Sequence, residues 1–241
     1  MQIVSFDEVT STNDIAHELA KQSAEDICVV ANAQTQGRGR LGRSWVTLPS
    51  HSLACSILIK NLGDRGEFLP LVTSIAVHQT LFKYAQCSIK WPNDILIFKD
   101  KVCGILVERG GSDEDIYYVV GIGVNLTLPT EGLPEGFVGT ILENHCKADS
   151  KIVRDDILVE LLKNLENNLK LLEQEGWVGQ LSNYYDDHCG SFCKEVTWFD
   201  GKEEITGIAR GVNNKGALVL QPEGGKLIEV HSGEIIKQGE R

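Results

Sequence analysis

The sequence predicts an α+β fold, divided into a larger domain over residues 1–190 and a small β domain over residues 191–241. In the first part, apolar runs typical of buried strands alternate with stretches whose apolar residues recur at helical spacing. In the second part, short strands are separated by turn-forming residues. The length of 241 residues and the hydrophobic content of 42% are enough for one substantial core and a smaller one.

The first predicted helix begins at the segment STNDIAHELAKQ. Ser11 or Thr12 is a suitable N-cap, Asp14 falls in the first turn, and two apolar residues follow one helical turn apart. Two runs of apolar and β-branched residues, ICVVANA at 27–33 and SLACSILIK at 52–60, then predict buried strands. These strands flank a loop that is rich in glycine and arginine.

The middle of the chain predicts one core helix over residues 68–82, followed by closely spaced strands. The strands are SIKW at 88–91, DILIF at 94–98, VCGILVE at 102–108 and IYYVVGIGVNL at 116–126. Only KDK separates the second strand from the third, which predicts a hairpin. Leucines at helical spacing from 158 to 172 indicate a long helix that Gly176 can end, and a further helix follows over 177–188.

The segment after Gly190 has a different pattern, typical of a small β-barrel. Its predicted strands are KEVTWF at 194–199, EEITGIARGV at 203–212, ALVLQ at 217–221 and KLIEVHSGEII at 226–236. Asp-Gly, Asn-Lys-Gly and Pro-Glu-Gly-Gly stand between them. These residues form turns because glycine reaches positive φ freely and Asp or Asn can bond its own backbone.

Composition argues against general binding to nucleic acids or membranes. The formal net charge is -11 and the pI about 5.0, so the surface as a whole repels phosphate backbones and anionic lipids. The N-terminal residues do not resemble a leader, and no run approaches the roughly 18 apolar residues of a membrane span. The seven cysteines are an odd number and lie mostly in apolar runs, which indicates reduced thiols. We therefore expect a cytoplasmic protein.

The most unusual segment is QGRGRLGRSW at 36–45, which places three arginines on a glycine-rich backbone between two strands. Glycine lets a backbone approach an anion closely, and guanidinium groups donate paired hydrogen bonds to phosphate or carboxylate oxygens. The segment lacks the Gly-Lys-Ser/Thr ending of a Walker loop. It also lacks the helix that follows the glycines of a dinucleotide-binding fingerprint. A solvated basic loop and an RNA-binding segment are the alternatives, but RNA-binding Arg-Gly segments normally recur in disordered tracts. The segment therefore favours a small anionic ligand.

A second polar group is predicted in KWPNDILIFKDKVCGILVE at 90–108. Asn93 and Asp94 follow a Trp-Pro bend, and Lys101 precedes a strand in which Gly104 permits close approach. An ordinary turn at Asn93 and Asp94, and a solvated lysine in the hairpin, are the alternatives. Both remain open from these residues alone.

Other patterns carry less weight. The segment GIGVN at 121–125 suits a ligand against the backbone or a β-bulge, and it lacks the third glycine and the helix of a Rossmann site. His188, Cys189 and Cys193 have no second ligand pair at zinc spacing, so no zinc site is predicted. The absence of a Gly-x-Ser-x-Gly elbow argues against a hydrolase.

Five segments in one order, STND, AQTQGRGRLGRSW, KWPNDILI, KVCGILVE and VVGIGVNL, resemble the biotin protein ligase family. They span residues 6–125, and GIARGVNNKGALVL with HSGEI resembles the C-terminal barrel of that family. The resemblance implies a catalytic domain related to class II aminoacyl-tRNA synthetases, with a mixed sheet and flanking helices. An SH3-like barrel is expected to follow it.

The resemblance also implies a reaction. Members of the family use ATP and Mg²⁺ to convert biotin to biotinyl-5′-adenylate, and then transfer biotin to one lysine of an acceptor such as the biotin carboxyl carrier protein of acetyl-CoA carboxylase. Because the biotin carboxylate and the α-phosphate are both anionic, cationic side chains must neutralise them. A lipoate ligase is the nearest alternative, and the arginine-rich loop favours biotin over it. An RNA-binding module is the main non-enzymatic alternative, which the net charge argues against.

The resemblance implies roles for individual residues. The expected catalytic residues are Lys101 and Arg40. The expected biotin-binding residues are Ser11, Thr12, Asn13, Gln34, Arg38, Gly39, Arg40, Lys101, Gly104 and Gly123. The expected ATP-binding residues are Arg38, Arg40, Arg43, Trp45, Asn93, Lys101 and Asn125. Mg²⁺ bound with ATP is expected near Asn93 and Asp94, without a separate cluster of metal ligands.

The sequence also differs from parts of the family. Leu41 stands where some members have another basic residue, which leaves the loop less cationic. About ten residues precede STND, too few for the helix-turn-helix domain of ligases that are also repressors, so neither operator repression nor specific DNA binding is expected. The loop at 36–45 is expected to be mobile until an anion neutralises its arginines, and then to cover the intermediate. A homodimer through a free edge of the central sheet remains open.

Overall fold

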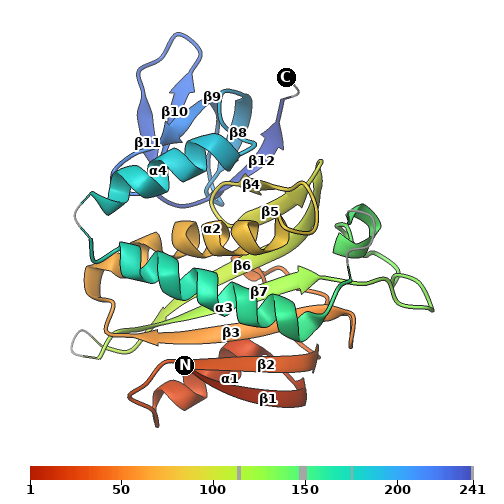
Figure 1. The fold of residues 1–241 in the computed structure, drawn as a ribbon. Helices are drawn as coiled ribbons and strands as arrows, with labels where there is room; N and C mark the ends of the chain where they lie inside the picture. Colours follow the sequence, from red (N-terminus) through yellow and green to blue (C-terminus); the bar gives the residue numbers. More distant parts are fainter. Residues whose placement is uncertain (113–114, 147–150, 175, 240–241) are drawn as a thin grey trace.

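The computed structural model describes residues 1–112, 115–146, 151–174 and 176–239, which form two β-sheets joined through helices (Figure 1). The larger sheet has the strand order β1-β2-β3-β7-β6-β5-β4. Its strands are β1 (Gln2–Val9), β2 (Ile27–Gln34), β3 (Ser52–Lys60), β4 (Ser88–Lys90), β5 (Asp94–Ile97), β6 (Asp100–Gly110) and β7 (Tyr117–Asn125). β1 and β2 are parallel and the other neighbouring pairs are antiparallel, so the sheet is mixed, as predicted.

Helices cover the two faces of this sheet unequally. They are α1 (Thr12–Ala20), α2 (Leu69–Leu81), α3 (Arg154–Leu171) and α4 (Trp177–His188), with short 3₁₀ segments η1 (Arg40–Gly42), η2 (Gly63–Phe68) and η3 (Leu142–His145). Successive residues of a strand point to opposite faces. In β2, Val29 therefore packs with Ala16 and Ala20 of α1, while Cys28 and Val30 belong to the main core. Figure 1 shows α2 and α3 side by side across that second face.

α2 is enclosed on nearly all sides, between the sheet and the helices α3 and α4. Its sequence, LPLVTSIAVHQTL, has apolar or small residues all round, as a fully buried helix requires. The hydroxyl groups of Ser74 and Thr80 bond to backbone carbonyls one turn earlier, at 2.9 and 2.8 Å. Both hydroxyl groups therefore have a hydrogen-bond partner although the helix is buried.

The C-terminal region forms a second, five-stranded antiparallel sheet with the order β11-β10-β9-β8-β12. Its strands are β8 (Glu195–Phe199), β9 (Glu204–Val212), β10 (Leu218–Pro222), β11 (Ile228–Val230) and β12 (Glu234–Gln238). The α+β class is thus confirmed. The segment 226–236, predicted as one strand, is instead split by Gly233 at φ 98°, and its two halves lie on opposite edges of the sheet.

The two sheets share one hydrophobic core. Trp198 and Leu218 of the second sheet belong to the same buried cluster as Ile89 of the first. Buried Tyr185 of α4 joins the parts further, because its hydroxyl lies 2.7 Å from Ser74 Oγ and donates to the carbonyl of Pro92 at 3.0 Å. The domain boundary at residues 190 and 191 falls between α4 and β8 and stays a prediction. In the described ranges no helix is long and apolar enough to cross a membrane.

Two features near the N-terminus differ from the sequence analysis. Strand β1 was not predicted, because it lies at the edge of the sheet and exposes both of its faces, so only Val9 is buried. Ser11 stands at the N-cap of α1 but makes no capping bond with its side chain. The hydroxyl of Thr12 instead donates to Gln34 Oε1, at 3.1 Å.

Buried His78 connects α2 to its neighbours and resists protonation. Its Nδ1 lies 2.8 Å from the Tyr184 hydroxyl and its Nε2 lies 3.1 Å from the carbonyl of Cys87. The ring also packs against His188, with centroids 4.7 Å apart. Burial lowers the pKa of His78 from 6.5 to about 4.

This lowered pKa predicts a pH-dependent stability. Between pH 6.5 and about 4 the unfolded chain binds a proton at position 78 that the folded chain does not, so the free energy of unfolding should fall as the pH falls. The loss should approach about 3 kcal/mol at the low end of that range. Denaturant unfolding of the wild type and of His78→Gln, measured from pH 4 to 8, should show a smaller slope in the variant. His231→Gln, at an exposed histidine, is the control and should keep the wild-type slope; equal slopes for all three proteins would contradict the assignment.

Candidate active site

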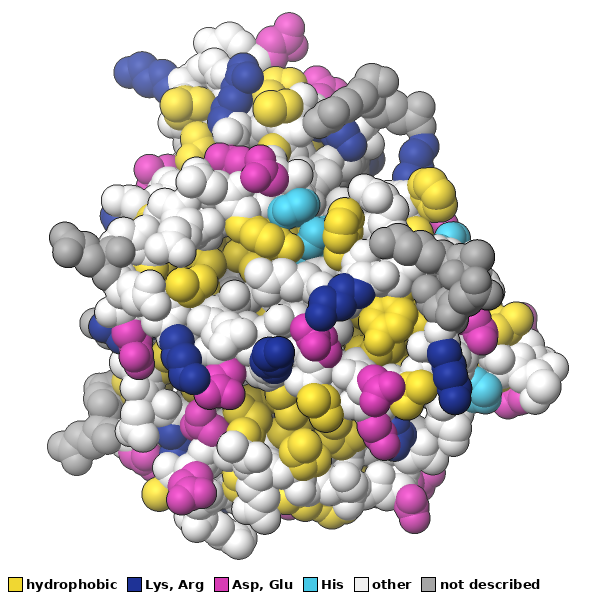
Figure 2. Space-filling view, viewed as in Figure 1, with side chains coloured by type: hydrophobic (Ala, Val, Ile, Leu, Met, Phe, Trp, Pro, Cys, Tyr) yellow, Lys and Arg dark blue, Asp and Glu magenta, His cyan; other side chains and the backbone are white. Residues whose placement is uncertain are grey.

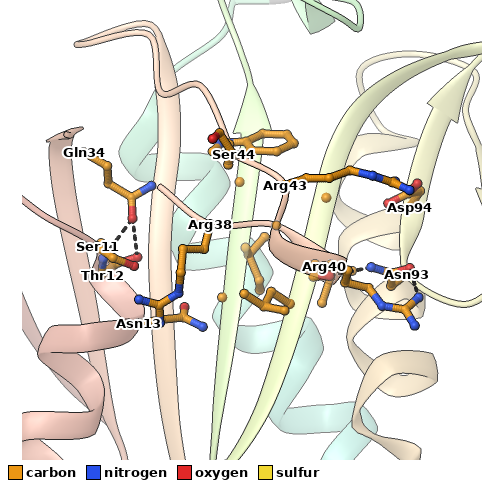
Figure 3. A pocket seen from close by; sticks show the side chains of 18 of the residues that line it. Ser11, Thr12, Asn13, Gln34, Arg38, Arg40, Arg43, Ser44, Asn93 and Asp94 are labelled. Atoms are coloured by element: carbon orange, nitrogen blue, oxygen red, sulfur yellow. Dashed lines mark hydrogen bonds between the residues drawn. The ribbon is translucent and has the colours of Figure 1, made fainter. Parts of the chain in front are cut away.

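One pocket lies on the face of the large sheet that carries α1, and the loop 36–45 borders it (Figure 3). The predicted site residues that line it are Ser11, Thr12, Asn13, Gln34, Arg38, Gly39, Arg40, Arg43, Trp45, Asn93, Asp94, Lys101, Gly104 and Gly123. Residues that line it without having been predicted are Ser44, Ile105, Leu106, Gly121, Ile122 and Glu234. Segments from five parts of the chain therefore meet at one place, while the individual roles stay predictions.

The floor of the pocket is a pair of glycines on adjacent strands. Gly104 of β6 stands directly opposite Gly123 of β7. A Cβ atom at Gly123 would overlap the indole of Trp45, and one at Gly104 would lie 2.8 Å from Lys101 Nζ and 3.0 Å from Trp45 Cζ3. Trp45 and Lys101 therefore lie against bare backbone, with Lys101 Nζ 5.5 Å from the centroid of the indole ring.

A hydrogen-bonded group closes the end of the pocket at the start of α1. Gln34 Oε1 accepts from the backbone N–H of Thr12 at 2.8 Å, and Gln34 Nε2 donates to Thr47 Oγ1 at 2.9 Å. The buried hydroxyl of Ser56 lies 2.7 Å from Thr12 Oγ1 and 2.5 Å from Asn13 Oδ1. These bonds fix the amide of Gln34, which lies opposite Arg43 and Asp94 across the pocket in Figure 3.

The arginine loop is folded as a small closed turn. The N–H of Gly39 donates to the carbonyl of Arg43 at 2.7 Å, and the N–H of Trp45 donates to the carbonyl of Gly37 at 2.8 Å. A Cβ atom at Gly37 would lie 2.5 Å from the carbonyl oxygen of Trp45, so this closure requires glycine there. Leu41 has a positive φ of 55° and points to solvent with 54% of its surface exposed. Leu41 does not line the pocket. The lack of a basic residue at position 41 therefore leaves the set of arginines that line the pocket the same.

Arg38 and Arg43 each form an ion pair with the protein itself. Arg38 pairs with Asp14 and lies 3.4 Å from Glu108, and the hydrogen bond to Asp14 raises the pKa of Arg38. Arg43 donates to both carboxylate oxygens of Glu234, one of them at 2.8 Å, which raises the pKa of Arg43. Arg38 and Arg43 therefore do not lack counter-charges as expected, while the mobility of the loop before a ligand binds stays a prediction. Acidic side chains from α1, β6 and β12 already provide these counter-charges.

Glu234 is the acidic residue that links the C-terminal sheet to the loop. Burial raises the pKa of Glu234, but the hydrogen bond and charge of Arg43 outweigh this effect and hold that pKa below its usual value. Glu234 stands 191 residues from its partner in sequence, and only the fold brings the two together. The sequence contained no local signal for this contact.

Arg40 is the loop arginine that reaches inward. Burial lowers its pKa, against the opposing effect of the charges on Asp94 and Glu234. The guanidinium group donates to Asn93 Oδ1 at 3.1 Å, and Asn93 Nδ2 donates to the carbonyl of Ile105 at 2.5 Å. Arg40 remains a cation, since arginine is not deprotonated in proteins. Asn93 lies in the turn 91–93, but its side chain bonds to half-buried Arg40 and to the carbonyl of Ile105.

Lys101 and Asp94 form an ion pair inside the pocket. Nζ of Lys101 lies 2.7 Å from Asp94 Oδ1, yet that oxygen has no hydrogen-bond partner, so the pair is close without good hydrogen-bond geometry. Trp45 Nε1 is likewise buried without a partner. Two of the five buried side-chain atoms that lack a hydrogen-bond partner among the described residues thus belong to this pocket. The alternative of a solvated hairpin lysine does not fit this position.

Asn125 is the predicted site residue that the structure leaves outside the pocket. It ends β7, is 2% exposed, and its Nδ2 donates to the carbonyl of Thr140 at 3.2 Å. The side chain therefore bonds through Nδ2 to the loop behind Lys101, while its Oδ1 has no hydrogen-bond partner. In the structure Asn125 orders that loop, and a contact with ATP stays a prediction.

The sequence and the fold are similar to those of known proteins. Residues 5–125 match the biotin/lipoate A/B protein ligase family, and residues 194–238 match the biotin protein ligase C-terminal domain. The chain is 30% identical over 223 residues to the bifunctional ligase/repressor BirA of Escherichia coli, covering 90% of this chain and 68% of that protein. It is 29% identical over 226 residues to a biotin--[acetyl-CoA-carboxylase] ligase of Paracoccus denitrificans, covering 90% and 93%. The structure is similar to a biotin protein ligase from Aquifex aeolicus in complex with biotin and ATP, with TM-score 0.79, 28% identity and 99% of each chain covered.

The glycine floor predicts a specific effect of one methyl group. Gly123→Ala should displace the indole of Trp45, because the two cannot occupy the same space, and should lower the free energy of unfolding by about 1–3 kcal/mol. Acrylamide quenching should show a more exposed tryptophan than in the wild type, and this difference should vanish in a Trp45→Phe background. Gly179→Ala is the matched control, since a Cβ atom there meets nothing within 4 Å. Quenching and stability unchanged in Gly123→Ala would show that the indole does not lie on this glycine.

Proposed function

This chain belongs to the biotin/lipoate A/B protein ligase family, and we propose how its pocket residues carry out the reaction. The protein is an ATP-dependent biotin protein ligase that activates biotin with ATP. One observation supports the division of roles best: two cations, Lys101 and Arg40, converge on a glycine floor opposite the fixed amide of Gln34. The lipoate alternative is less favoured, because the C-terminal region also matches a biotin ligase domain.

Biotin is proposed to lie along the floor between these two polar ends. Its ureido group would bond to Ser11, Thr12 and Gln34, because their amide, hydroxyl and backbone groups offer both donors and acceptors. Its apolar rings would lie beside Gly104 and Gly123, which requires the indole of Trp45 to move from its present position over these glycines. Its carboxylate would then point toward Lys101.

The first chemical step joins two anions. A carboxylate oxygen of biotin attacks the α-phosphorus of ATP, the bond to the β-phosphate breaks, and pyrophosphate leaves. Lys101 and Arg40 would stabilise the added negative charge, and Arg40 is effective there because it is already buried. Lys101 must exchange its pairing with Asp94 for a pairing with the reacting oxygens. In the second step a neutral lysine amine attacks the carbonyl carbon, AMP leaves, and the nitrogen loses a proton.

Mg²⁺ is proposed to bind with ATP at the side of the pocket formed by Asp94. The pocket offers the carboxylates of Asp94 and Glu234, and one oxygen of Asp94 lacks a hydrogen-bond partner. Throughout the part of the chain that the structure describes, no group of three His, Cys, Asp or Glu side chains could hold a metal by itself. This donor set suits Mg²⁺, which keeps waters and binds one or two carboxylates together with phosphates. The bound ion would neutralise charge on the phosphates.

The remaining proposals concern the acceptor, the compartment and assembly. The acceptor proposed is a biotin carboxyl carrier protein of acetyl-CoA carboxylase, as the name of the Paracoccus relative suggests. A cytoplasmic location is supported by the seven cysteines, all of them free and five buried.

A homodimer could form through β1, an edge strand that exposes Ile3 and Phe6. Nucleic acid is not proposed as a partner.

A direct test of the function uses the purified protein with biotin, MgATP and a biotin carboxyl carrier domain. We expect biotin-dependent exchange of labelled pyrophosphate into ATP, followed by attachment of one biotin to the carrier, detected with streptavidin and by mass. Lipoate in place of biotin is the control for substrate class. Exchange supported by lipoate and not by biotin would contradict the proposal.

Lys101 is predicted to be essential for the first step. Lys101→Ala should slow pyrophosphate exchange by about 100- to 1000-fold, because loss of one cation from a water-poor phosphoryl-transfer site costs on the order of 3–4 kcal/mol. The fold should persist, as checked by circular dichroism and thermal unfolding. Lys99→Ala is the matched control, two residues away in the same hairpin and outside the pocket, and should keep near wild-type exchange. Equal damage from both substitutions would remove the assignment of Lys101.

A further inference from the structure

A second, wider hollow lies beside the active site, between the β5–β6 hairpin and strand β12. It has a volume of about 630 Å³, compared with about 110 Å³ for the active-site pocket. Its lining includes four lysines, Lys90, Lys99, Lys194 and Lys237, and the apolar residues Phe98 and Ile236. Among the described residues that line it there is no Asp or Glu. The described lining is therefore basic and partly apolar.

This charge stands out against the rest of the protein. The whole chain carries a formal net charge of -11. Over the helices that face the viewer in Figure 2, Lys and Arg side chains are interspersed with Asp and Glu. Within the described ranges, four lysines and no carboxylate line this hollow, which favours a local positive potential that attracts acidic partners. The effect of Lys90 already reaches the active site, where its charge lowers the pKa of Glu234.

The hollow also exposes apolar surface that a folded chain normally buries. Phe98 at the hairpin turn is 84% exposed and Ile236 is 37% exposed. Phe98 has a positive φ of 54°, a conformation that bulky residues rarely adopt. Apolar side chains surrounded by polar ones are typical of a protein-protein contact, in which the aromatic residue supplies the buried centre.

Two strands run continuously from the active site into the hollow. β5 gives Asp94 to the pocket and Leu96 to the hollow, while β12 gives Glu234 to the pocket and Ile236 to the hollow. A shift of two residues along a strand is about 7 Å. The four-carbon stem of a lysine covers a comparable distance. A protein seated in the hollow could thus extend one of its lysines into the pocket.

We propose that this hollow is the docking surface for the acceptor domain, which binds through an acidic segment beside the lysine to be modified. The inference rests on the proposed function and adds where the acceptor binds and what chemistry selects it. Carboxylates of the acceptor pair with Lys194 and Lys237, and an apolar side chain of the acceptor covers Phe98. Nucleic acid fits less well, because the formal net charge of -11 on the whole chain repels a phosphate backbone.

The test separates docking from chemistry. The double substitution Lys194→Glu with Lys237→Glu should raise KM for a biotin carboxyl carrier domain at least tenfold at low salt. It should leave kcat for transfer and biotin-dependent pyrophosphate exchange near wild type, since neither lysine lines the active-site pocket. Lys202→Glu with Lys215→Glu is the matched control, with the same charge change on exposed turns of the same sheet. It should leave KM within about twofold of wild type, because exposed charges away from a contact act weakly.

Additional measurements test the apolar contact at Phe98, the charge pairing with the acceptor, and nucleic acid as an alternative occupant. Phe98→Ser should raise KM for the carrier without changing pyrophosphate exchange, and a carrier whose acidic residues near the acceptor lysine are changed to lysine should bind the double variant better than the wild type. Unchanged KM for the carrier, or an equal rise of KM in both double variants, would overturn the proposal. Inhibition of carrier biotinylation by an equimolar amount of polyuridylate would also overturn it. Loss of pyrophosphate exchange in the Lys194 and Lys237 variant would also overturn it, because the defect would lie in the pocket. Absence of biotin-dependent exchange in the wild type would instead contradict the proposed function.

Discussion

The active site depends on two glycines that face each other across β6 and β7. Because Gly104 and Gly123 lack side chains, an indole and an ammonium group can lie directly against the sheet. Trp45 ends the arginine loop and Lys101 is the second residue of β6, so this contact fixes where the loop returns to the fold and where the ammonium group of Lys101 lies. The other residues that line the pocket surround Trp45 and Lys101.

Charge is distributed so that a mainly acidic protein can hold a cationic pocket. Asp14, Glu108 and Glu234 stand at the outside of the loop and pair with Arg38 and Arg43. The inner cations have weaker partners, an amide for Arg40 and an imperfectly aligned carboxylate for Lys101. The outer pairs keep the loop folded, while the inner groups remain able to exchange partners. A substrate carboxylate or phosphate therefore meets charges that are already placed and partly desolvated.

Local sequence patterns predicted much of this architecture, and long-range contacts account for what they missed. Helical spacing and apolar runs sufficed for the core helices and inner strands, and glycine with arginine at 36–45 indicated the anion site. β1 was missed because an exposed edge strand has no burial pattern, and the split of 226–236 depended on one glycine with positive φ. Glu234 could not be anticipated, since its function as a partner of Arg43 arises only when residues 191 positions apart meet. Asn125 matched a motif, yet its side chain bonds through Nδ2 to a loop.

The contact between Arg43 and Glu234 has a consequence for protein synthesis. A chain emerges from the ribosome N-terminal end first, so the strands and helices of the large sheet exist before residue 234 has been made. Until then the outer arginine of the loop has no carboxylate from β12, and the wall of the pocket is incomplete. Because β12 belongs to the second sheet, the loop gains its last carboxylate partner only when the C-terminal region has folded against the large sheet.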